Sequence, residues 1–342
     1  MQQAKKKVAE KKKKKIHPLM RLLFDTHCHP QDDTCNVDLI PQLPVAGLCL
    51  IGVRDIDWPV VEELHSRYGD KVRAAFAVHP WYAHRRGSDW LEELEALLRR
   101  NPAAIVGEIG LDRAATTPDT GRCEHQHQLE VFEKQFRLAG RLQRPVSIHC
   151  VRAFGQFFEA VQQILKEDGK MALPPSIIMH SYGGTAGMMD SLTTMKQGIG
   201  SRFYFSFSPV INMRSPKTVE VIKHIPQDRL LIETDQNTPT SIEDDIMEMC
   251  EIVAKARGWS VEQAARITLE NAQRVFDFPR IAPGPPEMDD DEGAFASLAG
   301  LHVRDDDGAK ANATSNEKDD DEEEEEEDDS DGASSGWWVK RP

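Results

Sequence analysis

The sequence predicts an α/β fold, a parallel (β/α)8 TIM barrel, for the central part of the chain, and three observations favour it. About 260 residues lie between two charged tails, close to the ~250 residues typical of such barrels. Short apolar runs alternate with helical patterns eight times, which favours a closed parallel barrel over an open doubly wound sheet. Five of the eight runs end in a histidine or a carboxylate, as expected where strand ends form a site.

The eight apolar runs have the length and composition of strands in a parallel sheet that is covered on both faces. They occupy residues 22–25, 47–53, 72–78, 103–109, 145–150, 176–180, 203–207 and 230–235. Each is therefore expected to form one strand of the barrel.

Helical patterns lie between these runs. Ser88 is the expected N-cap of one helix, which Asn101 and the proline after it should end. Further helices are expected over 122–143 and 241–257, and over a final segment that opens with Ser260 and Gln263 at capping-box spacing.

Charge is distributed unevenly and divides the chain into three parts. We expect a basic disordered tail over 1–20, a barrel domain over 21–280 and an acidic, low-complexity disordered tail over 281–342. Eight lysines lie in the first 15 residues, and 21 acidic against three basic residues lie at 287–332. A net charge of about −6 is left for the body, which therefore offers no overall basic field for nucleic acid.

The tails can be interpreted either as functional segments or as charged tails without a specific partner. The lysine block is typical of a nuclear-localisation or nucleic-acid patch, but also of tails with no specific partner. Trp337 and Trp338 form a candidate docking motif for a protein partner, which the sequence does not decide. The acidic tail would repel DNA, so it could tune access or bind basic partners.

Cysteine usage and hydropathy indicate the compartment. Six cysteines without a CxxC pair indicate free thiols in a reducing, intracellular compartment, the nucleus, the cytoplasm or both. No apolar run approaches the ~20 residues of a membrane span, so no membrane association is expected. The lysine-rich start is not followed by an apolar stretch and does not resemble a secretory signal.

Metal-ligand residue types gather at the strand ends. His27 and His29 follow the first run two residues apart, so both can point to one face and bind one ion. The other ends carry Glu108, His149, His180 and Asp235. Four histidines and two carboxylates exceed what one tetrahedral zinc needs, whereas two divalent ions (zinc, magnesium or manganese) bridged by a carboxylate would use them all. Such a pair is typical of hydrolases.

Each of these residues also has a structural interpretation. His149 or His180 alone at a strand end is more often a hydrogen-bonded core histidine. Glu108 could be a buried, paired carboxylate, and Asp235 could cap the helix that follows it. The joint placement of all six at strand ends favours the metal site.

Five ordered motifs carry a resemblance to a known family. The motifs are D-T-H-C-H (25–29), G-E-I-G-L-D (107–112), P-V-S-I-H (145–149), H-S-Y-G-G (180–184) and E-T-D (233–235). On these motifs the chain resembles the TatD family, metal-dependent deoxyribonucleases of the amidohydrolase superfamily, over about residues 22–278. The variations are similar to a fungal branch, some members of which are named for association with a subunit of the anaphase-promoting complex.

The resemblance implies a role for each predicted ligand. His27 and His29 would bind one ion, and Glu108 would bridge it to a second ion. His149 and His180 would hold that second ion. Asp235 would bind the first ion and accept the proton of the attacking water, so Asp235 and Glu108 are the expected catalytic residues.

The resemblance also implies residues around the metal pair. Arg152 and His79 are expected to contact substrate, while Asp25 and Glu233 would support the ligands or be ordinary strand-end carboxylates. Arg152 lies three residues after His149, where the family has its arginine two residues after. Because this and other departures lie where substrate would bind, the metal ligands are predicted more firmly than the substrate.

Three functions are compatible with the sequence. The first is a deoxyribonuclease that cleaves DNA phosphodiester bonds with a metal-activated water. The second is a hydrolase of a small ester or amide, since the same metal pair serves either bond. The third is a barrel scaffold that binds a cell-cycle protein, against which the intact ligand set counts.

Overall fold

A computed structural model describes residues 16–85, 87–117 and 119–276 of the 342-residue chain. The predicted tails therefore lie almost entirely outside the described residues, and so do Trp337 and Trp338. The three-part division of the chain stays a prediction.

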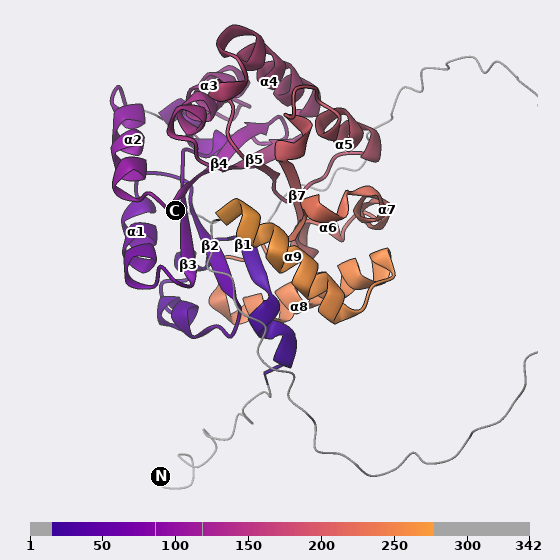
Figure 1. Cartoon of the computed structure of the whole chain (residues 1–342). Helices are drawn as coiled ribbons and strands as arrows, with labels where there is room; N and C mark the ends of the chain where they lie inside the picture. Colours follow the sequence, from indigo (N-terminus) through magenta and orange to yellow (C-terminus); the bar gives the residue numbers. More distant parts are fainter. Residues whose placement is uncertain (1–15, 86, 118, 277–342) are drawn as a thin grey trace, which may run out of the picture. The chain divides into compact units, whose positions relative to one another are not determined.

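Eight parallel strands form a single sheet in the order of the sequence, β1 to β8. They are β1 (Phe24–Cys28), β2 (Gly47–Gly52), β3 (Val72–Phe76), β4 (Ile105–Asp112), β5 (Val146–Val151), β6 (Ile177–Met179), β7 (Phe203–Phe207) and β8 (Leu230–Ile232). Every strand overlaps one of the predicted apolar runs. The (β/α)8 barrel predicted from the sequence is confirmed, and Figure 1 shows its strands surrounded by helices.

The barrel closes just beyond the end of β8. The Asp235 amide donates to the His27 carbonyl over 2.9 Å, and the His29 amide donates to the Gln236 carbonyl over 2.7 Å. The side chain of Thr26 adds a third link, to the Ile232 carbonyl at 3.0 Å. Because these bonds join the first and last strands, the segments that carry His27, His29 and Asp235 become neighbours.

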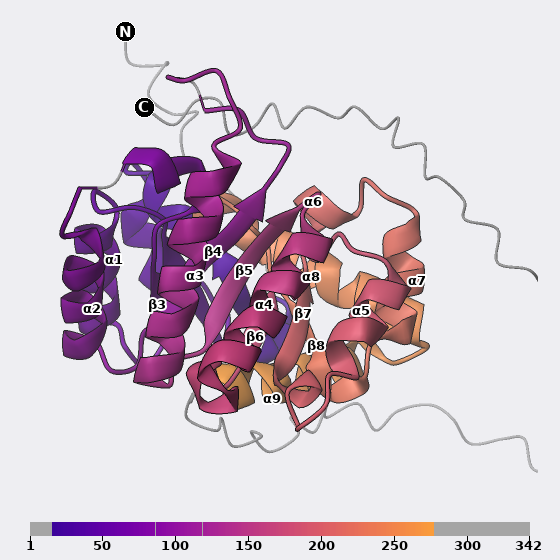
Figure 2. The same ribbon diagram turned by 90° about the horizontal axis from the view of Figure 1, so that it is seen from above.

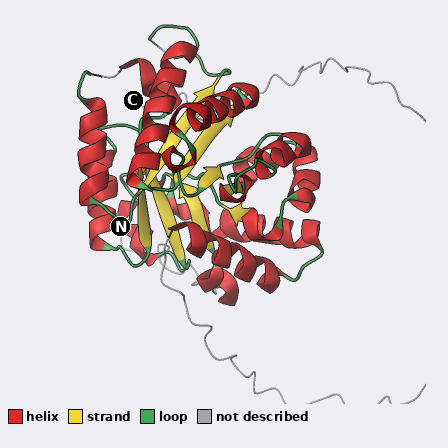
Figure 3. Cartoon of the chain, turned by 45° about the horizontal axis from the view of Figure 1, so that its top comes forward, coloured by secondary structure: helices red, strands yellow, loops and turns green. Residues whose placement is uncertain are grey.

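Nine α-helices lie in the described part of the chain, around the strands (Figures 2 and 3). They are α1 (Trp58–Arg67), α2 (Trp90–Arg100), α3 (His125–Leu142), α4 (Phe154–Asp168), α5 (Ala186–Thr193), α6 (Pro209–Asn212), α7 (Lys217–His224), α8 (Pro239–Arg257) and α9 (Val261–Phe276). Short 3-10 helices are η2 (Pro18–Leu22), η3 (Pro30–Asp32), η4 (Val37–Gln42), η5 (Pro80–Arg85), η6 (Lys170–Ala172), η7 (Gly200–Arg202) and η8 (Gln227–Arg229).

Two helix starts test the capping predictions. The capping box before α9 is confirmed: the Gln263 amide donates to Ser260 Oγ over 3.1 Å, and Gln263 Oε1 accepts from the Ser260 amide over 2.9 Å. The Ser88 cap is wrong, because α2 begins at Trp90 after Asp89, and the Ser88 hydroxyl bonds the Asp89 carboxylate instead. An acceptor next in sequence drew the hydroxyl away from the helix amides.

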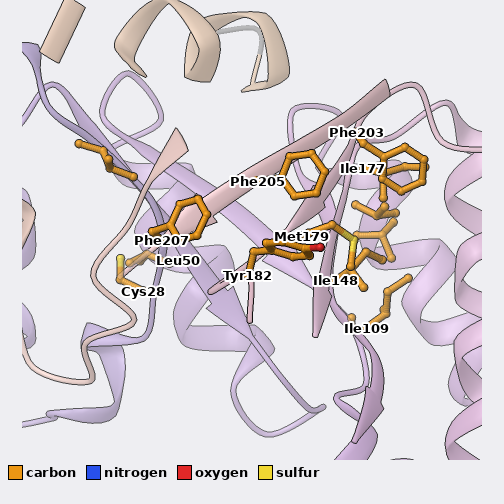
Figure 4. Close-up of a cluster of buried hydrophobic side chains, with 14 of the residues drawn as sticks. Cys28, Leu50, Ile109, Ile148, Ile177, Met179, Tyr182, Phe203, Phe205 and Phe207 are labelled. Carbon is orange, nitrogen blue, oxygen red and sulfur yellow. The ribbon is translucent and has the colours of Figure 1, made fainter. Parts of the chain in front are cut away.

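The hydrophobic core has two parts, because successive strand side chains point to opposite faces. Leu48 and Leu50 of β2 belong to a large cluster that packs against the surrounding helices, part of which Figure 4 shows. Cys49 and Ile51 of the same strand belong to a smaller cluster with side chains of α9. Asn271 anchors α9 by donating to the carbonyls of Gln227 and Leu230, each at 2.8 Å.

Candidate metal centre

Two strands change register where they carry a predicted ligand. The pairing of β1 with β2 shifts between Asp25 and Cys28, around His27. The pairing of β4 with β5 shifts between Val106 and Ile109, around Glu108. Register shifts of this kind redirect side chains and are common beside active sites. Here they accompany two buried predicted ligands, His27 and Glu108.

Close packing of β4 on β5 requires glycine at position 110. Gly110 is paired with His149, and a Cβ atom on Gly110 would lie 1.8 Å from the His149 carbonyl oxygen. Its φ of 150° is also one that other residues rarely adopt. The glycine in the G-E-I-G-L-D motif therefore lets β4 bring Glu108 next to the histidine of β5.

The first group of ligand atoms contains two histidines and two carboxylates. Nε2 of His27 and Nε2 of His29 lie 3.2 Å apart. Oε2 of Glu108 lies 3.4 Å from the first nitrogen and 3.8 Å from the second. Oδ1 of Asp235 lies 3.8 and 3.5 Å from the same two atoms. All four side chains are buried, so their polar atoms face one another rather than water.

The second group lies around the other oxygen of Glu108. Oε1 is 2.7 Å from His149 Nδ1 and 2.6 Å from His180 Nε2. The two nitrogens are 3.4 Å apart, and the His180 ring stacks on the His27 ring at 3.9 Å between centroids. The structure thus brings all six predicted ligands together, and Glu108 lies between the two histidine pairs.

The purely structural interpretation is wrong for Asp235, and for the other ligands it covers only part of the geometry. Thr238, rather than Asp235, occupies the N-cap of α8 and accepts from the Thr240 amide. His149 and His180 each have a partner of their own, Asp112 and Glu233, but both also contact the Glu108 carboxylate. Burying this many ionisable groups together is costly unless they are paired or hold a cation, and imidazole with carboxylate is a donor set that zinc and manganese accept. The residues therefore fit divalent metal ions.

Two further predicted residues hold the strand ends in place. Asp25 accepts from the Thr234 amide at 3.0 Å and hydroxyl at 2.6 Å, and from the His27 amide at 3.2 Å. Glu233 accepts from the Ser181 amide at 2.6 Å and hydroxyl at 2.7 Å, and lies 3.4 Å from His180 Nδ1. Both carboxylates thus contact ligand residues without joining the ligand atoms.

Burial and charge set the protonation of the centre. Burial raises the pKa of Asp235 to about 6, against the lowering effect of His27 and His180. Burial alone would raise the pKa of Glu108, but the surrounding histidines, His180 foremost, hold it well below its usual range. Burial opposes the charged form of His149, yet hydrogen bonds to two carboxylates raise its pKa to about 9. Without a bound ion, the centre therefore holds an ionised Glu108 beside a protonated His149 at neutral pH.

His79 lies at the edge of this cluster, with Nε2 3.5 Å from Glu108 Oε1. Its Nδ1 accepts a hydrogen bond of 3.1 Å from the Trp81 amide, so the ring proton of the neutral form lies on Nε2. Burial lowers the pKa of His79 to about 4, which keeps the ring neutral at pH 7. The distances alone would admit His79 as a ligand together with Glu108 and His149, but this tautomer makes its Nε2 a donor.

Three non-glycine residues that follow strands of the centre adopt positive φ angles. Arg152 follows β5 with φ 52° and is exposed, Ser181 follows β6 with φ 40°, and Asp235 follows β8 with φ 55°. Such conformations are uncommon outside glycine and cluster at functional sites. The turn at Arg152 places this arginine on the surface directly after the strand of His149.

Sequence reasoning assigned no positioning role to several residues that hold the ligands. Asp112, the last residue of β4, lies 3.0 Å from His149 Nε2, and Ser147 Oγ lies 3.0 Å from His27 Nδ1. Gln128 and Gln135 of α3 each hold a strand end through both amide atoms, Gln128 at Asp112 and Gln135 at Val78. Two signals in the sequence could have identified them. Asp112 ends the G-E-I-G-L-D motif at a strand end, and the two glutamines are seven residues apart, which places them on one face of a helix.

Comparison with known proteins agrees with the motifs. Residues 24–277 match the model of the family described as TatD related DNase. The Cut9-interacting protein scn1 of Schizosaccharomyces pombe is 27% identical, over 71% of this chain and 95% of its own length. The 3'-5' ssDNA/RNA exonuclease TatD of Edwardsiella piscicida is also 27% identical, over 69% and 89%.

A solved structure shows the same fold. The TatD homologue YJJV of Escherichia coli superposes with a TM-score of 0.61 at 22% identity, covering 76% of this chain and all of that one.

None of the helices in the described part of the chain combines the length and apolar character needed to cross a membrane. The family match spans most of the sequence and contains the whole ligand cluster. The chain therefore belongs to the TatD related DNase family, a family of metal-dependent hydrolases.

Proposed function

We propose that the chain binds two divalent ions and hydrolyses phosphodiester bonds of DNA. One observation carries the proposal: the Glu108 carboxylate directs Oε2 to His27 and His29 and Oε1 to His149 and His180. A carboxylate between two histidine pairs is the arrangement expected of a bridging ligand. Zinc or manganese suits these donors best, and magnesium, which prefers oxygen ligands, suits them least.

The proposed roles of the ligands follow from their positions. His27, His29 and Asp235 would hold one ion, and His149 and His180 would hold the other. When bound, the ions supply Lewis acidity and lower the pKa of water to near 7. Asp235, with a pKa of about 6, is ionised at neutral pH and accepts the proton of the attacking water.

Substrate contacts are assigned to two groups at the rim. His79 directs a neutral Nε2–H toward Glu108, where it donates to a phosphate oxygen of the substrate. Arg152 follows the strand of His149 and offers the fork of donors that phosphate accepts. Together they favour a phosphodiester over a neutral ester or amide.

DNA as the substrate is supported by the family and by one relative. The family is described as TatD related DNase, and the Edwardsiella relative is named a 3'-5' ssDNA/RNA exonuclease. The name of the Schizosaccharomyces relative supports an additional protein partner. That partner, contacts through the tails and residence in the nucleus or cytoplasm remain predictions.

Cleavage of end-labelled single-stranded and double-stranded DNA tests the proposal. Purified protein should cleave DNA only with added Zn²⁺ or Mn²⁺, and a Glu108→Ala, Asp235→Ala double variant should lose activity. Glu130→Ala, on the exposed face of α3, is the matched control and should retain it. Bound metal without DNA cleavage, together with hydrolysis of a small ester, would reject the nuclease in favour of the small-molecule hydrolase.

A further inference from the structure

His149 differs from the other three predicted histidine ligands in the nitrogen that it presents. His29 Nδ1 lies 3.2 Å from the Ile51 carbonyl, which can only accept, so its Nε2 faces the centre. His27 and His180 likewise have Nδ1 beside a supporting side chain and Nε2 toward Glu108. His149 is reversed: Nδ1 faces Glu108, and Nε2 lies 3.0 Å from Oδ2 of Asp112.

Hydrogen bonds hold both the side chain and the backbone of Asp112. Its Oδ2 also accepts from the Trp81 indole N–H at 2.8 Å, and its Oδ1 accepts from the amides of Ala114 and Ala115 at 2.9 Å each. These bonds and the one to His149 use the four acceptor positions of an ionised carboxylate. Gln128 holds the Asp112 backbone at both its amide, over 2.8 Å, and its carbonyl, over 3.0 Å. The buried side chain is therefore held in one orientation.

An ionised carboxylate in this position fixes the tautomer of the ring beside it. A neutral imidazole carries one N–H and one lone pair, and Asp112 can only accept. When His149 loses one proton, as metal binding requires, Nε2 must therefore keep the other, which leaves the Nδ1 lone pair directed to the space beside Glu108. Carboxylates that hold a metal-binding histidine in this way orient the ring and increase its basicity.

We propose that Asp112, anchored by Trp81, is a positioning residue that presents Nδ1 of His149 to the second metal ion. The inference rests on the proposed function, because it requires His149 to be a ligand. Asp112 should act on one ion only. Within the described part of the chain its side-chain hydrogen bonds go to His149, Trp81, Ala114 and Ala115, so its removal should weaken the ion at His149 and spare the ion at His27 and His29.

Metal affinity tests this asymmetry. Zn²⁺ binding is measured against a chelator for the full-length protein and for Asp112→Ala, Asp112→Asn and Trp81→Phe. We expect Asp112→Ala to weaken one of the two ions about 10–100-fold. Asp112→Asn would turn an NH2 group toward two of these N–H donors and should also weaken that ion, and Trp81→Phe, which removes one anchoring bond, should weaken the same ion roughly fivefold. Asp119→Ala is the control, because Asp119 bonds only His84 and Arg85 among the described contacts.

A second measurement reports the tautomer of the His149 ring directly. In long-range ¹H–¹⁵N spectra of the Zn²⁺-loaded protein, His149 should be protonated at Nε2 and metal-bound at Nδ1, and Asp112→Ala should lose this tautomer. Unchanged affinity for both ions with an unchanged tautomer in Asp112→Ala or Trp81→Phe would overturn the inference while leaving the proposed function intact. Wild-type protein that binds no ion would overturn both. If Asp112→Ala does not fold, Asp112→Asn and Trp81→Phe decide.

Discussion

Replacing Gly110 with alanine tests how closely β4 must approach β5 for the metal centre to form. The new methyl carbon would lie 1.8 Å from the His149 carbonyl oxygen, far inside contact distance, and the backbone φ is 150°. The unfavourable backbone conformation costs about 1–3 kcal/mol, and overpacking costs about 1–3 kcal/mol more. The free energy of unfolding should therefore fall by roughly 2–6 kcal/mol, and Tm by at least ~4 °C for a domain of this size.

Two measurements on the variant test this: urea denaturation gives its free energy of unfolding, and a separate metal analysis of the folded protein gives its Zn²⁺ content. Because the clash pushes on the residue that carries a predicted ligand, bound Zn²⁺ should fall together with stability. Gly155→Ala is the matched control: Gly155 is exposed in α4, a Cβ there meets no atom within 4 Å, and alanine should stabilise by up to ~1 kcal/mol. A Gly110→Ala protein within ~0.5 kcal/mol of wild type, with normal metal content, would refute the reasoning.

Three further predictions concern individual contacts. Neighbouring carboxylates raise the pKa of His149 to about 9 and that of His180 well above its usual value, so an ion that these two residues bind must displace protons. The affinity for this ion should therefore rise from pH 6 to 9, and as the pH falls this ion should be lost before the ion at His27 and His29. Calorimetry in two buffers can measure the protons released. Replacing His79 with alanine should lower kcat/KM on DNA without lowering metal content, whereas loss of an ion would make His79 a ligand. Ser260→Ala should cost about 0.5–2 kcal/mol of unfolding free energy through loss of its bond to the Gln263 amide; no change in a urea titration would contradict this.

The strands and the ligand residues were predictable because each leaves a local signal. A strand of this barrel is an apolar run, and its functional residue follows the run directly, as His149 follows the apolar part of β5. The two-residue spacing of His27 and His29 needed no knowledge of the fold. Proximity in space came from the expectation of a closed barrel, which the hydrogen bonds between the ends of β8 and β1 bear out.

Contacts between segments far apart in sequence could not be predicted in this way. Gln128 and Gln135 have no distinctive pattern of their own, and their bonds to the ends of β4 and β3 depend on the packing of α3 against the barrel. The bond from Trp81 to Asp112 joins η5 to the end of β4, 31 positions away in the sequence. The error at Ser88 has a local cause, since two adjacent residues are both good N-caps by type and the sequence does not show which of them starts the helix.

The central claim is that Glu108 bridges two ions, and metal stoichiometry tests it most directly. Mass spectrometry of native protein and a Zn²⁺ titration should find two ions per chain in the wild type, and Glu108→Ala should weaken both, because Oε2 and Oε1 each face one histidine pair. Glu130→Ala should bind as the wild type does. A Glu108→Ala protein that keeps either ion at wild-type affinity, or a wild type that binds only one, would contradict the account.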